Sequence, residues 1–298
     1  MAVKLELYRV FHEVARMGNI SAAAQNLFIS QSAVSQSIKQ LEEQLQVRLF
    51  SRSTKGVYLT SEGKLLQEYI SHALGLIQSG EEKLAQSRQL LTGELIIGAS
   101  DTVTKTYLLS RLEAFHRDYP DIRIRILNGT SHMVLNYLHA GQVDIAFAST
   151  PQEAASLETF PCLTTHSIFV AGAEYPCDFD HVYSLEEIAQ FPLILLERKA
   201  SSRLFLEKYF LQNGLHLHPE IELGARSLLV DLAAIGFGVA GVTEEFVHRE
   251  LDSGRLRKLR TSFDIPARSV DLCVLRDVPL TSAAQRFSDF IRESLHRG

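Results

Sequence analysis

The sequence predicts a multidomain α/β protein with a helical N-terminal domain, one long helix and a larger domain in which strands and helices alternate. Apolar residues recur at three- and four-residue spacing through the first 45 residues, which is typical of short amphipathic helices. The same spacing then runs from Ser61 to about Leu91, which is longer than most globular helices. Beyond Gly93, short apolar runs alternate with helical patterns, which favours parallel sheets with helices on both faces.

The composition is that of an ordinary globular protein. Of the 298 residues, 46% are hydrophobic and 22% are charged, and the length allows two or three domains. No apolar run approaches the roughly 20 residues that a membrane span needs, and the charged N-terminus lacks a signal-peptide core. The cysteines Cys162, Cys177 and Cys273 are too widely spaced for a CxxC pair. We therefore expect a cytoplasmic protein with free thiols and no membrane partner.

Charge is distributed unevenly along the chain. Residues 1–66 hold eight Lys or Arg and five Glu, a net charge of +3, whereas the remaining residues have a net charge of −8. A basic N-terminal segment on an acidic body indicates a polyanion partner at one end of the chain.

Three short helices are predicted in the N-terminal segment. The first ends at Gly18, the second is expected to begin with Ser21 as its N-cap, and the third with Ser30 as its N-cap. The apolar stripe of the first helix is Leu7, Val10, Phe11 and Val14. The apolar stripe of the third helix is Val34, Ile38, Leu41 and Leu45.

The third helix also carries a polar face, formed by Ser32, Ser35, Gln36 and Lys39. Gln and Ser side chains can bond base edges, and Lys can reach guanine or phosphate. The stretch VRLFSRSTKGVYLT follows and predicts a small hairpin, in which Arg52 and Lys55 would touch a phosphate backbone. An ordinary solvated face is the alternative, but cap, turn, hairpin and basic charge together favour a winged helix-turn-helix.

The long helix predicted after Ser61 has one apolar stripe: Leu66, Tyr69, Ala73, Ile77, Gly80 and Leu84. A helix of this length cannot bury such a stripe on a small domain, so we expect it to pair with a second copy of itself. Packing against its own chain is the alternative.

No pattern in the sequence supports an enzyme. The run GFGVAG (236–241) satisfies the dinucleotide pattern GxGxxG, but a helix precedes it and a strand-like run overlaps it, which is the inverse of the required context. We interpret it as a helix end followed by a strand. The histidines contain no HExxH motif, and Ser100 does not lie in a GxSxG motif. We therefore expect no catalytic residues, no metal and no cofactor.

Residues 5–63 resemble the winged helix-turn-helix of LysR-type transcriptional regulators. The stretch AAAQNLFISQSAVSQSIKQLEEQLQVRLFSRSTKGVYLTSEG follows that family's pattern AA..L..SQ..VS..I..LE..L...LF.R......LT..G almost position by position. The resemblance implies a DNA-binding domain at 1–60, a linker and dimerisation helix at 61–91, and a two-lobed, periplasmic-binding-protein-like α/β effector domain at 92–298. Lobe one would then comprise 93–162 plus 267–298, and lobe two would comprise 163–266.

The resemblance also implies roles for particular residues. Recognition-helix positions fall on Gln31, Ser32, Ser35, Gln36 and Lys39, and wing or backbone-contacting positions fall on Arg52, Lys55 and Thr60. Ser32 stands where many family members have proline, and Gln36 where many have arginine, so no base sequence is assigned.

Effector contacts are implied after the first and second strands of lobe one and at the start of a lobe-two helix. They fall on Ser100, Asp101, Thr102, Gly129, Thr130, Ser131, Ser201, Ser202 and Arg203. Hydroxyls and free N–H groups at facing helix N-termini suit a small anion such as a carboxylate. The charge of Asp101 would oppose an anion unless that carboxylate points away or caps the helix.

We therefore expect a regulator that binds double-stranded promoter DNA as a homo-oligomer, a dimer or the tetramer that the family favours. A small-molecule effector would switch it, and RNA polymerase would be a partner if it is an activator. Two alternatives are an exported solute receptor and a nucleotide-using enzyme. The absence of a signal-peptide core argues against the first, and cofactor binding would distinguish the second.

Overall fold

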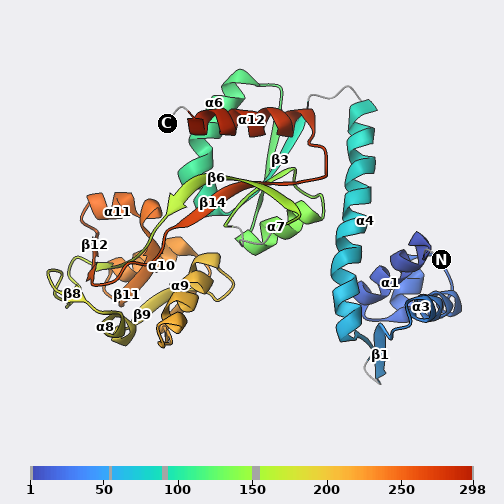
Figure 1. The fold of residues 1–298 in the computed structure, drawn as a ribbon, viewed down its shortest axis with the longest axis horizontal. Helices are drawn as coiled ribbons and strands as arrows, with labels where there is room; N and C mark the ends of the chain where they lie inside the picture. The colour runs from blue at the N-terminus through green and yellow to red at the C-terminus, as the bar shows by residue number, and fades with distance from the viewer. Residues whose placement is uncertain (1–2, 54–55, 89–92, 150–154, 297–298) are drawn as a thin grey trace. The chain divides into compact units, whose positions relative to one another are not determined.

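The computed structural model describes residues 3–53, 56–88, 93–149 and 155–296 (Figure 1). By packing, the chain divides into two compact units, Met1–Leu91 with His139–Gln142, and Thr92–Leu138 with Val143–Gly298.

The first unit begins with helices α1 (Leu5–Met17), α2 (Ile20–Asn26) and α3 (Gln31–Leu45), which pack around one apolar core. The predicted stripes form this core, with Leu7, Val10, Phe11, Val14, Val34, Ile38 and Leu41 buried and Leu45 partly buried. The expected N-cap at Ser21 is wrong, because Asn19 caps α2 by accepting a hydrogen bond from the Ala22 N–H. Ser30 caps α3 as predicted, accepting a bond from the Ala33 N–H at 3.2 Å.

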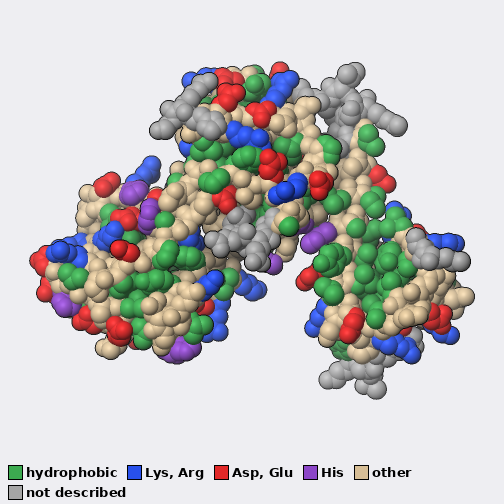
Figure 2. Space-filling view, viewed as in Figure 1, with side chains coloured by type: hydrophobic (Ala, Val, Ile, Leu, Met, Phe, Trp, Pro, Cys, Tyr) green, Lys and Arg blue, Asp and Glu red, His purple; other side chains and the backbone are tan. Residues whose placement is uncertain are grey.

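After α3 the chain forms a hairpin of β1 (Phe50–Ser53) and β2 (Gly56–Leu59), and then the long helix α4 (Ser61–Arg88). The predicted hairpin and long helix are therefore confirmed. Leu66 is partly buried against the core, while Tyr69, Ala73, Ile77, Gly80 and Leu84 are exposed. Hydrophobic side chains accordingly come to the surface along α4 in Figure 2.

The first sheet of the second unit has the strand order β4-β3-β5-β14-β6. Its strands are β3 (Glu94–Ala99), β4 (Arg123–Asn128), β5 (Ile145–Ala148), β6 (Leu157–Thr165) and β14 (Arg268–Leu275). One face is covered by a helical stretch made of α5 (Asp101–Val103), a π-helical turn η1 (Thr104–Leu108) and α6 (Leu109–Asp118), together with α12 (Ser282–His296). The other face is covered by α7 (Ser131–His139) (Figure 1). We call this part the first lobe.

The second sheet has the order β10-β9-β11-β7-β12 and forms what we call the second lobe. Its strands are β7 (Ser167–Gly172), β9 (Leu193–Leu196), β10 (Ile221–Leu223), β11 (Val239–Thr243) and β12 (Leu256–Lys258). Helices α8 (Leu185–Gln190) and α9 (Ser201–Gln212) cover one face, and α10 (Arg226–Ala234) covers the other. A short parallel pair, β8 (Val182–Tyr183) with β13 (Arg260–Thr261), and the turns η2 (Glu244–Phe246) and α11 (His248–Asp252) complete the lobe.

The run GFGVAG is a helix end followed by a strand, as interpreted. Helix α10 ends at Ala234, Gly236 adopts a left-handed φ of 87°, and β11 begins at Val239. The run therefore lacks the strand-then-helix context that binds a pyrophosphate.

The expectation of parallel sheets is only partly right, because both sheets are mixed. β3 pairs in parallel with β4 and β5, and β9 pairs in parallel with β10 and β11. In contrast, β14 runs antiparallel to β5 and β6, and β7 runs antiparallel to β11 and β12. The antiparallel strands arise where the chain passes between the lobes, out through β6 and back into β14.

The sequence analysis did not predict β6, which contains Pro161. Proline lacks the N–H of a sheet ladder, so its presence argues against a central strand. Here β6 is an edge strand, and Pro161 pairs with Asp271 where the register shifts between Val270 and Asp271. The predicted lobe boundary at 162/163 falls inside this strand.

Phe28, in the turn before α3, gives a prediction about stability. It has a left-handed φ of 55°, and its side chain is 95% exposed. An L-residue with a Cβ pays roughly 1–2 kcal/mol for this conformation, and Asn tolerates it better. We expect Phe28→Asn to raise the free energy of unfolding of the N-terminal unit by about 0.5–1 kcal/mol.

The matched control is Phe28→Ala. It also removes the exposed ring, but it lacks the side-chain amide that lets Asn tolerate a left-handed φ. Thermal unfolding of the full chain should show a higher first transition for Phe28→Asn than for Phe28→Ala. Equal transitions for the two variants would contradict the strain at this turn.

Candidate functional site

The exposed face of α3 is the first candidate site. Gln31, Ser32, Gln36 and Lys39 are exposed and Ser35 is half-buried, while the apolar side of the same helix is buried in the core. The Ser32 hydroxyl lies 2.9 Å from that of Ser30, and Lys39 forms an exposed ion pair with Glu43 at 3.6 Å. Such an exposed pair contributes little stability and leaves the ammonium free to change partner.

The predicted wing is described only in part. Arg52 lies in β1, and Lys55 lies outside the described residues. Thr60 belongs to the internal structure of the domain: its hydroxyl donates to the carbonyls of Arg48 and Leu49 and accepts a bond from the Gly63 N–H. These bonds fix Thr60 immediately before α4, and its predicted contact with the phosphate backbone stays a prediction.

The second candidate site is a cavity of about 580 Å³ between the two lobes. This volume lies within the range of sites for small organic ligands. The first lobe contributes Ser100, Asp101, Thr102, Lys105, Asn128, Gly129, Thr130, Ser131 and Ser149. The second lobe contributes Ser201, Ser202, Arg226, Leu229, Val242, Thr243 and Phe246, and the crossing strands contribute Thr165, Arg268 and Val270.

The structure therefore brings together all but one of the predicted effector-binding residues. Ser100 caps α5 by accepting a bond from the Val103 N–H, and the Thr130 hydroxyl accepts one from Met133 at the start of α7. The Asp101 carboxylate accepts a hydrogen bond from the Asn128 side chain. That bond gives the carboxylate a partner inside the cavity.

Hydrogen bonds between described side chains join the lobes across the cavity. Arg226, the first residue of α10, donates from Nε to the Thr102 hydroxyl at 3.1 Å. The hydroxyls of Ser131 and Ser201 lie 3.3 Å apart, and Ser131 also accepts a bond from the Ser149 N–H. The relative position of the lobes is thus linked to the same side chains that line the cavity.

Arg203 corrects the sequence analysis, because it does not line this cavity. Its side chain is fully buried in the second lobe, where it forms ion pairs with Glu207 at 2.6 Å and Glu222 at 3.5 Å. It also donates to the Leu196 carbonyl. Arg203 follows Ser202 directly in α9, about 100° further around the helix, so its guanidinium faces the interior of the lobe and not the cavity.

The sequence analysis missed two arginines, Arg226 and Arg268. Both stand at the first residue of an element, Arg226 in α10 and Arg268 in β14. Arg268 lies just after the predicted lobe boundary at 266/267, and this position is the signal that could have found it. Arg226 lies far from both predicted boundaries in the sequence, and no such signal marks it. Burial lowers the pKa of Arg226, opposed by the charge of Glu250. Burial likewise lowers the pKa of Arg268, opposed by the charge of Glu245.

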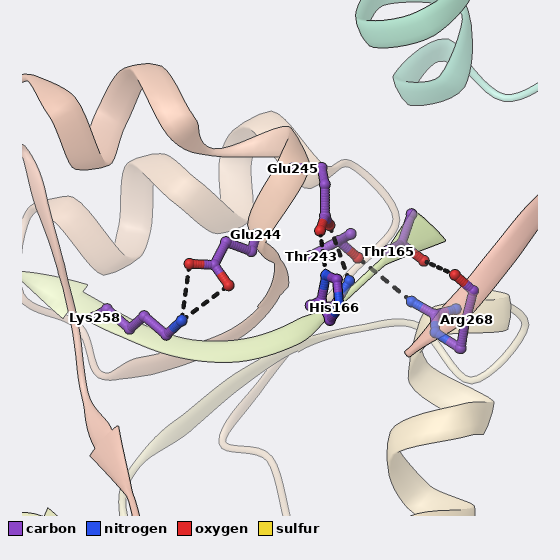
Figure 3. Close-up of polar contacts among 7 residues, drawn as sticks. All are labelled: Thr165, His166, Thr243, Glu244, Glu245, Lys258 and Arg268. Atoms are coloured by element: carbon purple, nitrogen blue, oxygen red, sulfur yellow. Dashed lines mark hydrogen bonds and ion pairs between the residues drawn. The ribbon is translucent and has the colours of Figure 1, made fainter. Parts of the chain in front are cut away.

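Arg268 lies in a polar cluster where the chain crosses between the lobes (Figure 3). Its carbonyl accepts a bond from the Thr165 hydroxyl at 3.2 Å, and its Nη2 lies 3.5 Å from the Thr243 hydroxyl. Beside it, Glu245 accepts bonds from the backbone N–H of His166 at 2.9 Å and makes a second bond to Nδ1 of the same residue at 2.6 Å. Burial opposes ionisation of Glu245, but these bonds outweigh it and the pKa of Glu245 is lowered.

The same cluster extends to Lys258, which donates to both carboxylate oxygens of Glu244 at 2.8 and 2.9 Å. Glu244 and Glu245 thus each have a basic partner of their own (Figure 3). Neither carboxylate forms a salt bridge with Arg268 among the residues that the structure describes.

Among the described residues, no helix combines the length and the hydrophobicity that a membrane span requires. No group of three or more His, Cys, Asp or Glu side chains among the described residues is arranged to hold a metal ion.

A helix-turn-helix with a wing, followed by a two-lobed domain with a polar cavity, defines a ligand-responsive DNA-binding regulator. Comparisons with known proteins agree. Residues 5–64 match the model of the bacterial regulatory helix-turn-helix protein, lysR family, and residues 88–296 match that of the LysR substrate binding domain. The chain belongs to the LysR family of transcription regulators.

The chain is similar to relatives over nearly its whole length. It is 28% identical over 289 residues to the HTH-type transcriptional regulator YofA of Bacillus subtilis, covering 96% of this chain and 97% of that one. Among solved structures, the CcmR regulatory domain of Synechocystis in complex with 2-PG matches with a TM-score of 0.62 at 19% identity, over 68% of this chain and 97% of that one. The effector binding domain of QuiR in complex with shikimate matches with a TM-score of 0.61 at 15% identity, over 69% and 98%. At these identities the structural matches show the fold alone.

The bond between Thr102 and Arg226 gives a second prediction. Thr102→Val removes the acceptor without changing the size of the side chain much, so the lobes should separate more readily. We expect backbone amides at 224–230 to exchange their hydrogens about fivefold faster, equivalent to about 1 kcal/mol.

The matched control is Thr106→Val. The Thr106 hydroxyl donates only within its own helix, to the Thr102 carbonyl. Hydrogen exchange at 224–230 should be unchanged in this variant. An equal acceleration in both variants would show that the bond between Thr102 and Arg226 does not slow hydrogen exchange at 224–230.

Proposed function

We propose that this regulator reads promoter DNA with the exposed face of α3 and that a small anion bound in the cavity changes how it does so. The observation that carries the first part is the division of α3 into a buried apolar side and a polar side with no role in the core. Gln31, Ser32, Ser35, Gln36 and Lys39 would enter the major groove, where amide, hydroxyl and ammonium groups can bond base edges. Arg52 and Lys55 would contact the phosphate backbone from the wing.

Charge in the cavity supports the second part of the proposal. Arg226, Arg268 and Lys105 line it, against one carboxylate, that of Asp101. Ser100 and Thr130 add hydroxyls at the starts of α5 and α7, and Ser201 and Ser202 add hydroxyls at the start of α9. Because these groups belong to both lobes, an anion bound among them would favour one arrangement of the lobes over another.

The exposed stripe on α4 supports assembly with a second copy. Tyr69, Ala73, Ile77, Gly80 and Leu84 leave an apolar face uncovered on a helix of 28 residues. Pairing of two such helices would place two recognition helices on one pseudo-palindromic site. We propose a homo-oligomer, a dimer or a tetramer, acting in the cytoplasm without enzymatic activity, and contacting RNA polymerase if it activates transcription. The predicted divisions at 60/61, 91/92, 162/163 and 266/267 are retained as part of this proposal.

Substitution on α3 tests the DNA-reading part. A binding site is first selected from a pool of random double-stranded DNA with the full chain, and affinity is then measured by gel shift. We expect Gln36→Ala with Lys39→Ala to lower affinity for the selected site at least tenfold, about 1.4 kcal/mol, and to reduce the preference over random DNA.

The control is Lys208→Ala with Gln212→Ala on α9, which removes the same two kinds of side chain, about one helical turn apart, from an exposed face of the second lobe. This control should bind the selected site like the unaltered chain. Unchanged affinity and preference in the α3 variant would refute α3 as the recognition helix, and a loss in both variants would show that net charge alone is responsible.

A further inference from the structure

The two cavity arginines carry hydrogen-bond donors for which the described residues supply no acceptor. Arg268 Nε is buried without a partner, and the longest of its bonds, from Nη2 to Thr243, is 3.5 Å. Arg226 uses Nε for Thr102 and Nη1 for the Phe246 carbonyl, and no described residue accepts a bond from its Nη2. Neither guanidinium forms a salt bridge with a carboxylate within the described chain. Both side chains are half-buried, and donors taken out of water without an acceptor cost free energy that a ligand with acceptors would recover.

The two guanidinium groups have different neighbours. Arg226 bonds Thr102 of the first lobe and the Phe246 carbonyl, and Arg268 lies with its guanidinium carbon 5.0 Å from the centre of the Phe205 ring. Because each guanidinium is oriented by its own neighbours, each can bind an acidic group of its own.

The cavity suits an organic skeleton as well as acidic groups. It measures about 580 Å³, and its lining includes the apolar side chains of Leu229, Val242 and Val270. Apolar lining with a few fixed polar groups is the usual form of a site for a small organic molecule. Asp101 opposes a net negative ligand, but its carboxylate already accepts a bond from Asn128.

We infer that the ligand of this cavity is an organic dianion whose two acidic groups are bound separately, one by Arg226 and the other by Arg268. Dicarboxylates and phosphorylated carboxylic acids share this chemistry. Arginine binds both kinds of group through two parallel N–H bonds, so each end would be fixed in orientation as well as in charge. The inference rests on the proposed function, because it specifies the anion that the cavity would hold.

Sulfate serves as a probe for the two subsites, since it is an acceptor for arginine and does not require the natural ligand to be known. The shift in melting temperature of the full chain is measured in sulfate against chloride at equal ionic strength. The chain is compared with Arg226→Met, with Arg268→Met and with the double variant. Sulfate also stabilises proteins generally, and the shift that survives in the double variant measures that effect.

Two separate subsites predict additive losses. Each single variant should lose roughly half of the sulfate-specific shift, and the double variant should lose all of it. Loss of the whole shift in either single variant would show one shared anion, which overturns the dianion inference but leaves an anion-binding cavity. An equal shift in all four proteins would overturn the inference and the proposed anion site together.

A control separates anion binding from a general effect of charge. Arg249→Met removes an exposed arginine of the second lobe outside the cavity, and it should keep the full sulfate-specific shift. A loss in Arg249→Met equal to that in Arg226→Met would show that the shift depends on net charge and not on the cavity.

The same proteins are then titrated calorimetrically with succinate, glutarate and 2-phosphoglycolate, each against its counterpart with one acidic group, butyrate, valerate and glycolate. We expect the best dianion to bind at least tenfold more tightly than its counterpart and to lose at least tenfold in each single variant. Equal affinity across every pair would overturn the inference.

Discussion

Two antiparallel strands, β6 and β14, connect the lobes of the effector-binding domain, and the cavity depends on them. They pair from Leu157 with Leu275 to Thr165 with Arg268, so the pairing ends at the crossing point. There the Thr165 hydroxyl bonds the Arg268 carbonyl, and the Arg268 side chain lines the cavity. Because the same residue ends the strand pair and lines the cavity, a ligand that bonds its guanidinium acts directly on the connection between the lobes.

The charged side chains around this connection differ in whether they have a partner of opposite charge. Glu244 and Glu245 have their own basic partners, Lys258 and His166, whereas Arg268 has no carboxylate partner within the described residues (Figure 3). A buried arginine can be compensated from inside the protein, as Glu207 and Glu222 do for Arg203. Arg203 thus has carboxylate partners inside its own lobe. Arg268 has none among the described residues, so its guanidinium is available to a ligand.

Local signals predicted the N-terminal unit well. The Ser30 cap, the apolar stripe of α3 and the hairpin are each determined by a few neighbouring residues, and the structure contains all three. The Ser21 cap failed because Asn19, two residues earlier, competes for the same position with a side chain of equal capping strength. Helix N-termini also located most of the cavity, since Ser100, Thr130 and Ser201 mark where helices begin.

Contacts between residues far apart in the sequence determined the features that local sequence patterns did not predict. Arg203 and Arg226 both stand within the first turn of a second-lobe helix, and only the surroundings of each decide which one is buried with carboxylates and which one faces the cavity. Pro161 concealed β6, because no local pattern shows that a strand will lie at the edge of a sheet. The antiparallel direction of β14 likewise follows from the return of the chain between the lobes.

Crystallography can test whether Arg226 and Arg268 define an anion site at the connection between the lobes. Crystals of the full chain would be soaked in selenate, an analogue of sulfate whose selenium gives an anomalous signal. We expect two anomalous peaks in the cavity, one within hydrogen-bonding distance of the Arg226 guanidinium and one within hydrogen-bonding distance of the Arg268 guanidinium. A single peak bridging both arginines, or no peak in the cavity, would contradict this expectation.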